Sequence, residues 1–199
     1  HYVLLAQTIL EATAGQIDLF DRPLVDEIAK FARKITIING ISPAFADCPV
    51  KAEPDHNLMY FINRKWDMGL PQYSVPSKDK YLFDCVFYAF DSMDAIAQDV
   101  PTTPTLTTSL RDWFDATGIL VSRPAPDSAC RMGVAMKGGN NNEHHNHNDL
   151  GSYVVVVGNS TVLVDPGSER YTARTFSPHR YESKVLNSYG HPVPLVAGQ

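Results

Sequence analysis

The chain changes its hydrophobic pattern near residue 117, and this change limits the possible folds more than any other feature. Before it, apolar residues from Leu24 to Ile35 recur at steps of four, three and four, the spacing of one helix face. After it, β-branched runs at 153–157 and 160–164 flank Gly158-Asn159, a pair typical of a tight hairpin turn. The sequence therefore predicts an α+β chain with its helices first and its antiparallel strands second.

The expected elements divide into two predicted domains, a helical part over 1–116 and a β part over 117–199. Asp55 precedes a further apolar stretch and is a candidate helix cap, because its carboxylate can accept from a free backbone N–H. The pattern favours helices over 3–13, 24–35 and 81–98, and strands over 118–122, 130–136, 153–157 and 160–164.

Composition excludes several classes of protein. The chain has 199 residues, 44% of them hydrophobic, which is the composition of an ordinary globular protein. No apolar run approaches the ~20 residues of a membrane helix, and the net charge of −5 argues against a nucleic-acid partner. The three cysteines are far apart and form neither a disulfide framework nor a zinc-finger pattern.

The densest group of chemically active side chains is the run from Glu143 to Asp149, which includes His145 and His147. In a strand, residues two apart lie on one face, so both imidazoles could face the same way. Asp165 and His191 follow further along the chain. Two imidazoles and a carboxylate form a common zinc-binding set, which makes a metal site the leading interpretation.

Other interpretations of the same residues stay open. Three asparagines precede the histidines, which fits a plain polar loop, and Asp165 begins a common Asp-Pro-Gly turn. A cupin would place a glutamate after His147, where this sequence has none, and a metallo-β-lactamase-type hydrolase would have histidine in place of Leu150. A zinc hydrolase with an open metal position is a further alternative.

The string from His145 to Tyr153, followed by Asp165-Pro166-Gly167, resembles the heparinase II/III-like polysaccharide lyases, which include alginate and oligoalginate lyases. The segment 180–191 is similar to the part of that family that brings in a third metal ligand. The resemblance implies the C-terminal part of an (α/α) toroid followed by an antiparallel β-sandwich. It also implies that the toroid's own catalytic residues precede residue 1.

Residue by residue, the resemblance implies three kinds of role. The zinc ligands would be His147, Asp165 and His191, with the metal mainly structural. The catalytic side chains would be His145, Tyr181 and Tyr171. The substrate-binding side chains would be Arg170 and Asn146.

The resulting functional hypothesis is a bacterial polysaccharide lyase, periplasmic or secreted, that cleaves an alginate-type or glycosaminoglycan-type glycan by β-elimination. Its partner would be an acidic polysaccharide or oligosaccharide, with no nucleic acid and no membrane; the sequence predicts no oligomeric state. The alternative is a non-catalytic, zinc-stabilised carbohydrate-binding or cupin-like module.

Overall fold

The computed structural model describes residues 2–75 and 109–197, and these form an α+β chain as predicted. Two compact units can be distinguished. The first contains residues 1–32 and 53–107, and the second contains 33–52 and 108–199. The segment 33–52 therefore packs with the β part, although the sequence places it in the predicted helical domain; the domains 1–116 and 117–199 stay a prediction.

The first unit is built on helices α1 (Tyr2–Ala12), α3 (His56–Lys65) and the start of α2 (Pro23–Ile35). Phe20 packs against Phe61 and Trp66, with ring centroids 5.6 and 5.9 Å away. Asp55 caps α3 by accepting from the Leu58 N–H at 2.9 Å, which confirms the predicted cap. A short 3-10 turn, η1 (Pro71–Tyr73), follows. The helices predicted over 3–13 and 24–35 are confirmed, whereas the one over 81–98 lies outside the described residues.

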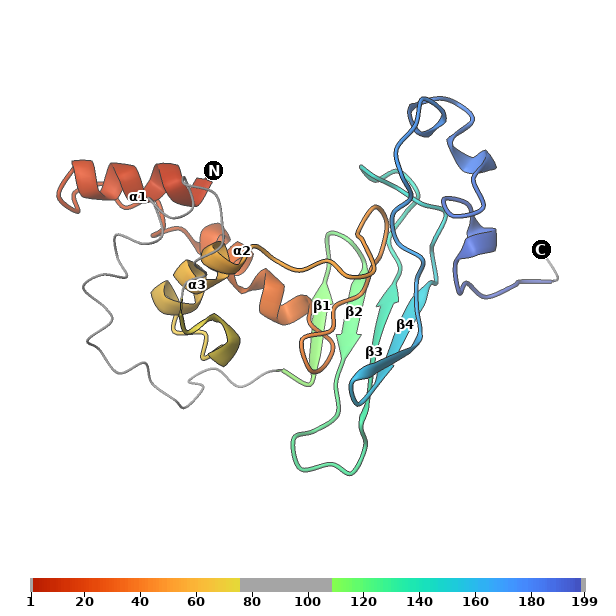
Figure 1. Cartoon of the computed structure of the whole chain (residues 1–199), viewed down its shortest axis with the longest axis horizontal. Helices are drawn as coiled ribbons and strands as arrows, with labels where there is room; N and C mark the ends of the chain where they lie inside the picture. The colour runs from red at the N-terminus through yellow and green to blue at the C-terminus, as the bar shows by residue number, and fades with distance from the viewer. Residues whose placement is uncertain (1, 76–108, 198–199) are drawn as a thin grey trace. The chain divides into compact units, whose positions relative to one another are not determined.

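The second unit contains a five-stranded antiparallel sheet in which each strand pairs with the next one along the chain (Figure 1). The predicted strands and the hairpin at Gly158 are confirmed, with Val157 paired to Ser160 across the turn. Gly158 has φ +60°, the left-handed conformation that such a turn requires. The strands are β1 (Arg111–Phe114), β2 (Ile119–Ser122), β3 (Met132–Lys137), β4 (Tyr153–Val157) and β5 (Ser160–Leu163).

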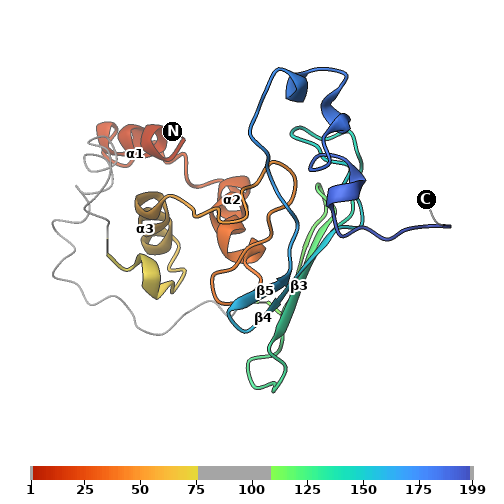
Figure 2. The same cartoon turned by 45° about the vertical axis from the view of Figure 1, so that its right-hand side comes forward.

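One face of this sheet is covered by the chain that follows α2 (Figure 2). Ile37 and Phe45 are buried against it. Gly133 on β3 allows this close approach, since a Cβ there would lie 2.7 Å from Ile37 Cγ2. Burying a side chain such as Ile37 contributes about 1.5–3 kcal/mol, so the segment is held firmly. The valines and alanine beneath it are Val121, Ala135, Val154 and Val156.

Three segments meet near one end of the sheet: the β3–β4 connection at 138–152, the chain after β5, and residues 44–48. The backbone N–H of Asn148 donates to Leu186 O at 2.9 Å, and the Ser168 N–H donates to Cys48 O at 3.1 Å. Three 3-10 turns shape the chain after β5: η2 (Arg174–Phe176), η3 (Arg180–Glu182) and η4 (Ser188–Gly190). None of the helices formed by the described residues is long and apolar enough to cross a membrane.

Candidate metal centre and its exposed neighbours

Two buried imidazoles lie side by side where these segments meet. The rings of His147 and His191 have centroids 5.3 Å apart. His147 Nε2 donates to Asp47 Oδ1 at 2.9 Å, and His191 Nδ1 donates to Asp165 Oδ2 at 2.8 Å. The other nitrogen of each ring, Nδ1 of His147 and Nε2 of His191, is buried with no hydrogen-bond partner. Each ring is therefore held by a carboxylate on one side and bare on the other.

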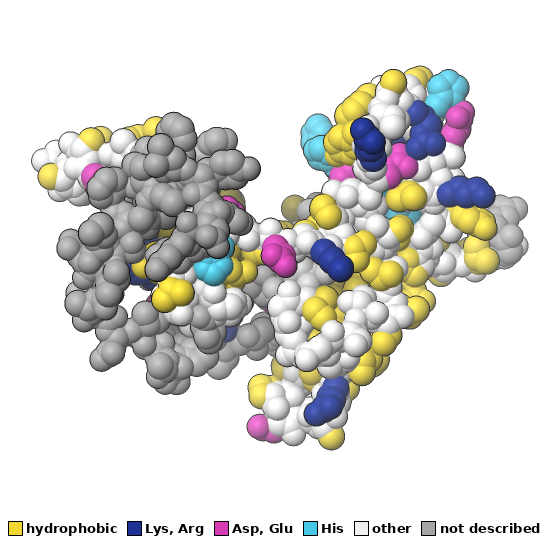
Figure 3. Space-filling view, viewed as in Figure 1, with side chains coloured by type: hydrophobic (Ala, Val, Ile, Leu, Met, Phe, Trp, Pro, Cys, Tyr) yellow, Lys and Arg dark blue, Asp and Glu magenta, His cyan; other side chains and the backbone are white. Residues whose placement is uncertain are grey.

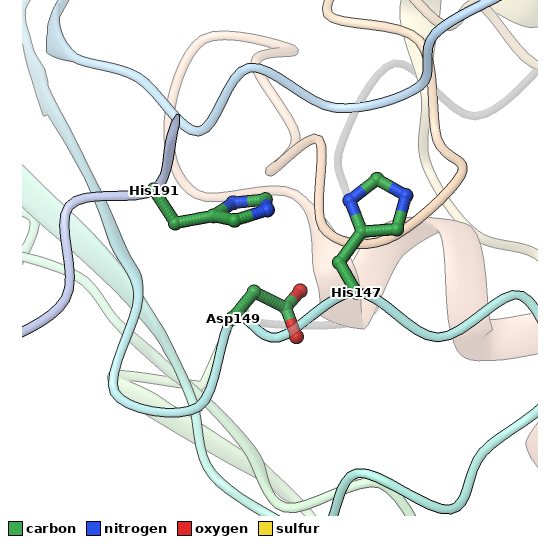
Figure 4. A group of neighbouring side chains, drawn as sticks. All are labelled: His147, Asp149 and His191. Atoms are coloured by element: carbon green, nitrogen blue, oxygen red, sulfur yellow. The ribbon is translucent and has the colours of Figure 1, made fainter. Parts of the chain in front are cut away.

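Asp149 is the third member of this group (Figure 4). One atom from each of His147, Asp149 and His191 lies within 4.8 Å of the others, and all three residues are buried. Two imidazole nitrogens and a carboxylate oxygen suit zinc, and a carboxylate behind each imidazole is the usual outer support of such a site. These residues therefore fit a metal ion, which would satisfy both bare nitrogens.

The charges around the two imidazoles also favour a cation. Asp47, Asp149 and Asp165 are at most 8% exposed, and Lys137 is the buried cation among them, donating to Asp149 at 2.7 Å. Three carboxylates against the Lys137 ammonium and the Arg180 guanidinium, which lies 3.5 Å from Asp47, still leave an excess of negative charge. Burial lowers the pKa of His147, although the hydrogen bond to Asp47 partly opposes this. A neutral imidazole is the form that binds a metal.

Asp165, the predicted carboxylate ligand, lies behind His191. Its carboxylate accepts from the Ser152 hydroxyl, from the Gly167 N–H at 3.0 Å and from His191. Burial would raise the pKa of Asp165, but these hydrogen bonds lower it overall. The three potential ligands that lie together in the structure are His147, Asp149 and His191. Asp149 is therefore the carboxylate of this group, whereas the sequence predicts Asp165 in that role. Asp149 stands two residues after His147 in the same string, and this spacing is the signal that could have identified it.

The other predicted side chains lie on the same loops, and all of them except the buried Asn146 reach the surface. The His145 side chain is 67% exposed, and its Nδ1 lies 3.0 Å from both Asp47 Oδ2 and the Tyr171 hydroxyl. His145 has φ +59°, so the loop turns there and the strand-like placement of His145 and His147 on one face does not occur. Tyr171 donates to Asp47 Oδ2 at 2.6 Å, and this bond raises the pKa of its phenol.

The exposed Tyr181 contacts the buried Asn146. Asn146 Nδ2 donates to the Tyr181 hydroxyl at 2.9 Å, while its buried Oδ1 has no partner. Arg180 donates to the Asn146 carbonyl at 2.9 Å and lies 3.5 Å from Asp47. Figure 3 shows histidine, carboxylate and basic side chains gathered at this end of the second unit (top right). Arg170 is exposed and adjoins Tyr171 in the chain.

Two contributors were not predicted from the sequence. Asp47 lies 100 residues before His147 and belongs to no recognisable motif. Arg180 is the first residue of the segment 180–191, but nothing in the sequence marks this arginine as part of a site. Both act through contacts between distant segments, which local patterns do not reveal.

Comparison with known proteins gives a structural likeness only. No protein-family model matches the sequence, and no curated protein matches it. Among solved structures, one described as a heparinase III gene product is similar over 93% of this chain with a TM-score of 0.50. The two share 16% sequence identity, and the chain covers 27% of that protein's length. The fold thus resembles part of a heparinase III fold.

Proposed function

We propose that this chain belongs to a polysaccharide lyase that cleaves a uronate-containing glycan by β-elimination. The observation that carries the proposal is the exposed group of one imidazole and two phenols, at His145, Tyr171 and Tyr181, directly beside a buried site fit for a metal. The likeness of the fold to part of heparinase III supports it.

The reaction needs the residue types found here. β-Elimination transfers the C5 proton of the uronate to a base, for which the exposed His145 imidazole is the candidate, and negative charge grows on the carboxylate. The C4–C5 double bond then forms as O4 leaves with a proton from an acid.

The hydrogen bond to Asp47 raises the pKa of the Tyr171 phenol, which is therefore protonated at neutral pH and would act as a proton donor and not as a base. The Tyr181 hydroxyl accepts from Asn146 and keeps its own proton free for a ligand. Asn146 and the exposed Arg170 supply the donor and the charge that a uronate carboxylate requires.

The metal belongs to the framework of this proposal. His147 and His191 would hold zinc with a carboxylate, and Asp149 and Asp165 are the two candidates for that ligand. Bound zinc would supply positive charge that balances the buried carboxylates and would fix the two loops in place. The protein's own residues would carry out the proton transfers.

The proposal extends to the surroundings of the site. The helices would be the end of an (α/α) toroid, and the sheet would be one layer of a β-sandwich. The substrate would be an alginate-type or glycosaminoglycan-type acidic polysaccharide, and the protein would be periplasmic or secreted. Each point follows from the family resemblance rather than from the site itself.

The test is an assay for the 4,5-unsaturated uronate by its ultraviolet absorbance, on alginate and on several glycosaminoglycans. We expect the complete gene product to form this chromophore and His145→Ala to abolish it while leaving zinc bound. His179→Ala is the matched control, because the His179 side chain is also 67% exposed but pairs only locally, with Glu182. Full activity in His145→Ala would contradict the proposal. Glycan binding without any product would favour the alternative binding module.

A further inference from the structure

Asp47 is the carboxylate that touches both the buried and the exposed parts of the site. Its Oδ1 accepts from His147 Nε2 at 2.9 Å. Its Oδ2 accepts from the Tyr171 hydroxyl at 2.6 Å and lies 3.0 Å from His145 Nδ1, with Arg180 at 3.5 Å. The side chain itself is only 8% exposed. The two oxygens therefore face different surroundings.

Asp165 provides an internal comparison. Its Oδ2 accepts from Nδ1 of the buried His191 imidazole at 2.8 Å, as Asp47 Oδ1 accepts from His147. Its remaining contacts, Ser152 and the Gly167 N–H, are both buried. Asp165 therefore supports His191 alone, whereas Asp47 supports His147 and two surface side chains at once.

A purely architectural role does not account for Asp47. The loop that carries it is already fastened by its backbone, since the Ser168 N–H donates to Cys48 O at 3.1 Å. Gly167 packs so closely that a Cβ there would lie 2.2 Å from the same carbonyl. The Asp47 carboxylate is therefore not needed to hold the loop, and its role lies in its hydrogen bonds to other side chains.

We propose that Asp47 is a positioning residue that couples the metal centre to the exposed phenol of Tyr171. The inference rests on the proposed function, because that function gives Tyr171 its role. A carboxylate behind a metal-bound imidazole orients the ring and strengthens it as a ligand. When the imidazole shares this carboxylate with a phenol, a change on one oxygen alters how strongly the other accepts. Coupling of this kind is reciprocal between the two sites.

The first experiment measures zinc affinity in the 199-residue chain by competition with a chelator. Asp47→Asn and Asp165→Asn each remove the charged support of one imidazole. We expect Asp47→Asn to weaken zinc binding by about 10- to 100-fold, the usual effect of losing such a support, and Asp165→Asn, which also changes a ligand candidate, to weaken it at least as much. An unchanged zinc affinity in Asp47→Asn would overturn the proposal.

The second experiment observes the phenol directly. With ¹³C-labelled tyrosine, the Tyr171 signal is assigned by its loss in Tyr171→Phe and followed during zinc addition at constant pH. We expect zinc to shift this signal in the wild type and in zinc-saturated Asp165→Asn, but not in zinc-saturated Asp47→Asn. A shift that survives in Asp47→Asn would mean that another path connects the sites and would overturn the assignment.

The wild type alone keeps the proposal falsifiable if Asp47→Asn fails to fold. Zinc binding that leaves the Tyr171 signal of the wild type unmoved would show that no coupling exists. Neither measurement uses a glycan or a turnover assay. A failure of the lyase proposal and a failure of this coupling can therefore be told apart.

Discussion

The buried and exposed parts of the site come from the same stretches of chain, yet they differ in almost every physical property. His147 and His191 are at most 6% exposed and sit among buried carboxylates. His145 and Tyr181 lie on the same stretches of chain as the ligand candidates, but their side chains reach solvent. The loops turn some side chains inward and others outward, so residues close together in sequence have different roles. We therefore expect substitutions in the buried part to lower stability and metal affinity, and substitutions in the exposed part to lower turnover.

The largest effect should come from Asp149→Ala in the buried part. The change removes a metal-ligand candidate and leaves Lys137, 2% exposed, without its closest partner. Breaking a buried ion pair on one side costs about 3–5 kcal/mol, so the free energy of unfolding in urea should fall by about that amount. Elemental analysis should also find less than one zinc per chain.

Asp165→Ala is the comparison for this variant, because it removes the other ligand candidate and leaves the ion pair of Lys137 with Asp149 intact. If Asp165→Ala loses zinc completely and Asp149→Ala retains it, the carboxylate ligand is Asp165, and Asp149 serves only the ion pair. His145→Ala, in the exposed part, should retain one zinc per chain.

Tyr181→Phe should have the opposite signature. Removing one hydroxyl from a side chain that is 37% exposed changes little packing but takes the acceptor from the buried Asn146 amide, so the free energy of unfolding should fall by about 1 kcal/mol. In the proposed lyase reaction this hydroxyl gives or takes a proton, a role whose loss typically costs about 10²–10⁴-fold, so the proposal predicts a fall of kcat by that factor. Tyr189→Phe, on an 80% exposed tyrosine of the same segment, is the control. Equal turnover in Tyr181→Phe and Tyr189→Phe would show that the Tyr181 hydroxyl has no role in the reaction.

The smallest effect concerns Glu169, which ties the loop of the exposed part together. It accepts from the Ser183 hydroxyl at 2.6 Å and from Arg174 at 2.8 Å. Burial would raise the pKa of Glu169, but these bonds lower it below its ordinary 4.5. Its contribution to stability is therefore complete above pH 4.5 and lost as the pH falls through the lowered value.

Glu169→Gln should thus lower the free energy of unfolding by about 1 kcal/mol at pH 7, a small figure because the pair is partly screened by solvent. The difference from wild type should shrink in thermal unfolding at acidic pH. Glu182→Gln, whose side chain is 66% exposed, should match the wild type at both pH values. A difference between Glu169→Gln and wild type that persists unchanged in acid would exclude the ionised carboxylate as the cause.

The sequence predicts the parts of this molecule that depend on local pattern. The β4–β5 hairpin follows from β-branched residues around Gly158, and the α3 cap follows from one side chain, Asp55. Strand β1 (Arg111–Phe114) was missed because it has no β-branched residue and alternates only between partly and fully exposed positions. Its identity as a strand comes from pairing with β2.

The same limit applies to the candidate site. His145, His147 and Asp149 stand in one short string, and their residue types already indicate metal chemistry. Asp47 is an unremarkable acidic residue until the chain folds and places it against His147. Which carboxylate faces the bare nitrogens is likewise decided by loop geometry, which spacing alone does not specify.

The distance of Asp47 along the chain has a consequence for how the molecule is made. Every strand of the sheet pairs with its neighbour in sequence, so the sheet closes through connections far shorter than those that bring the site together. The Asp47 contacts to His147 and Tyr171 span 100 and 124 residues. Contacts over such separations carry a larger entropic cost of loop closure and slow the search for the native state. We therefore expect both halves of the site to form in the last stage of folding, after the sheet that supports them.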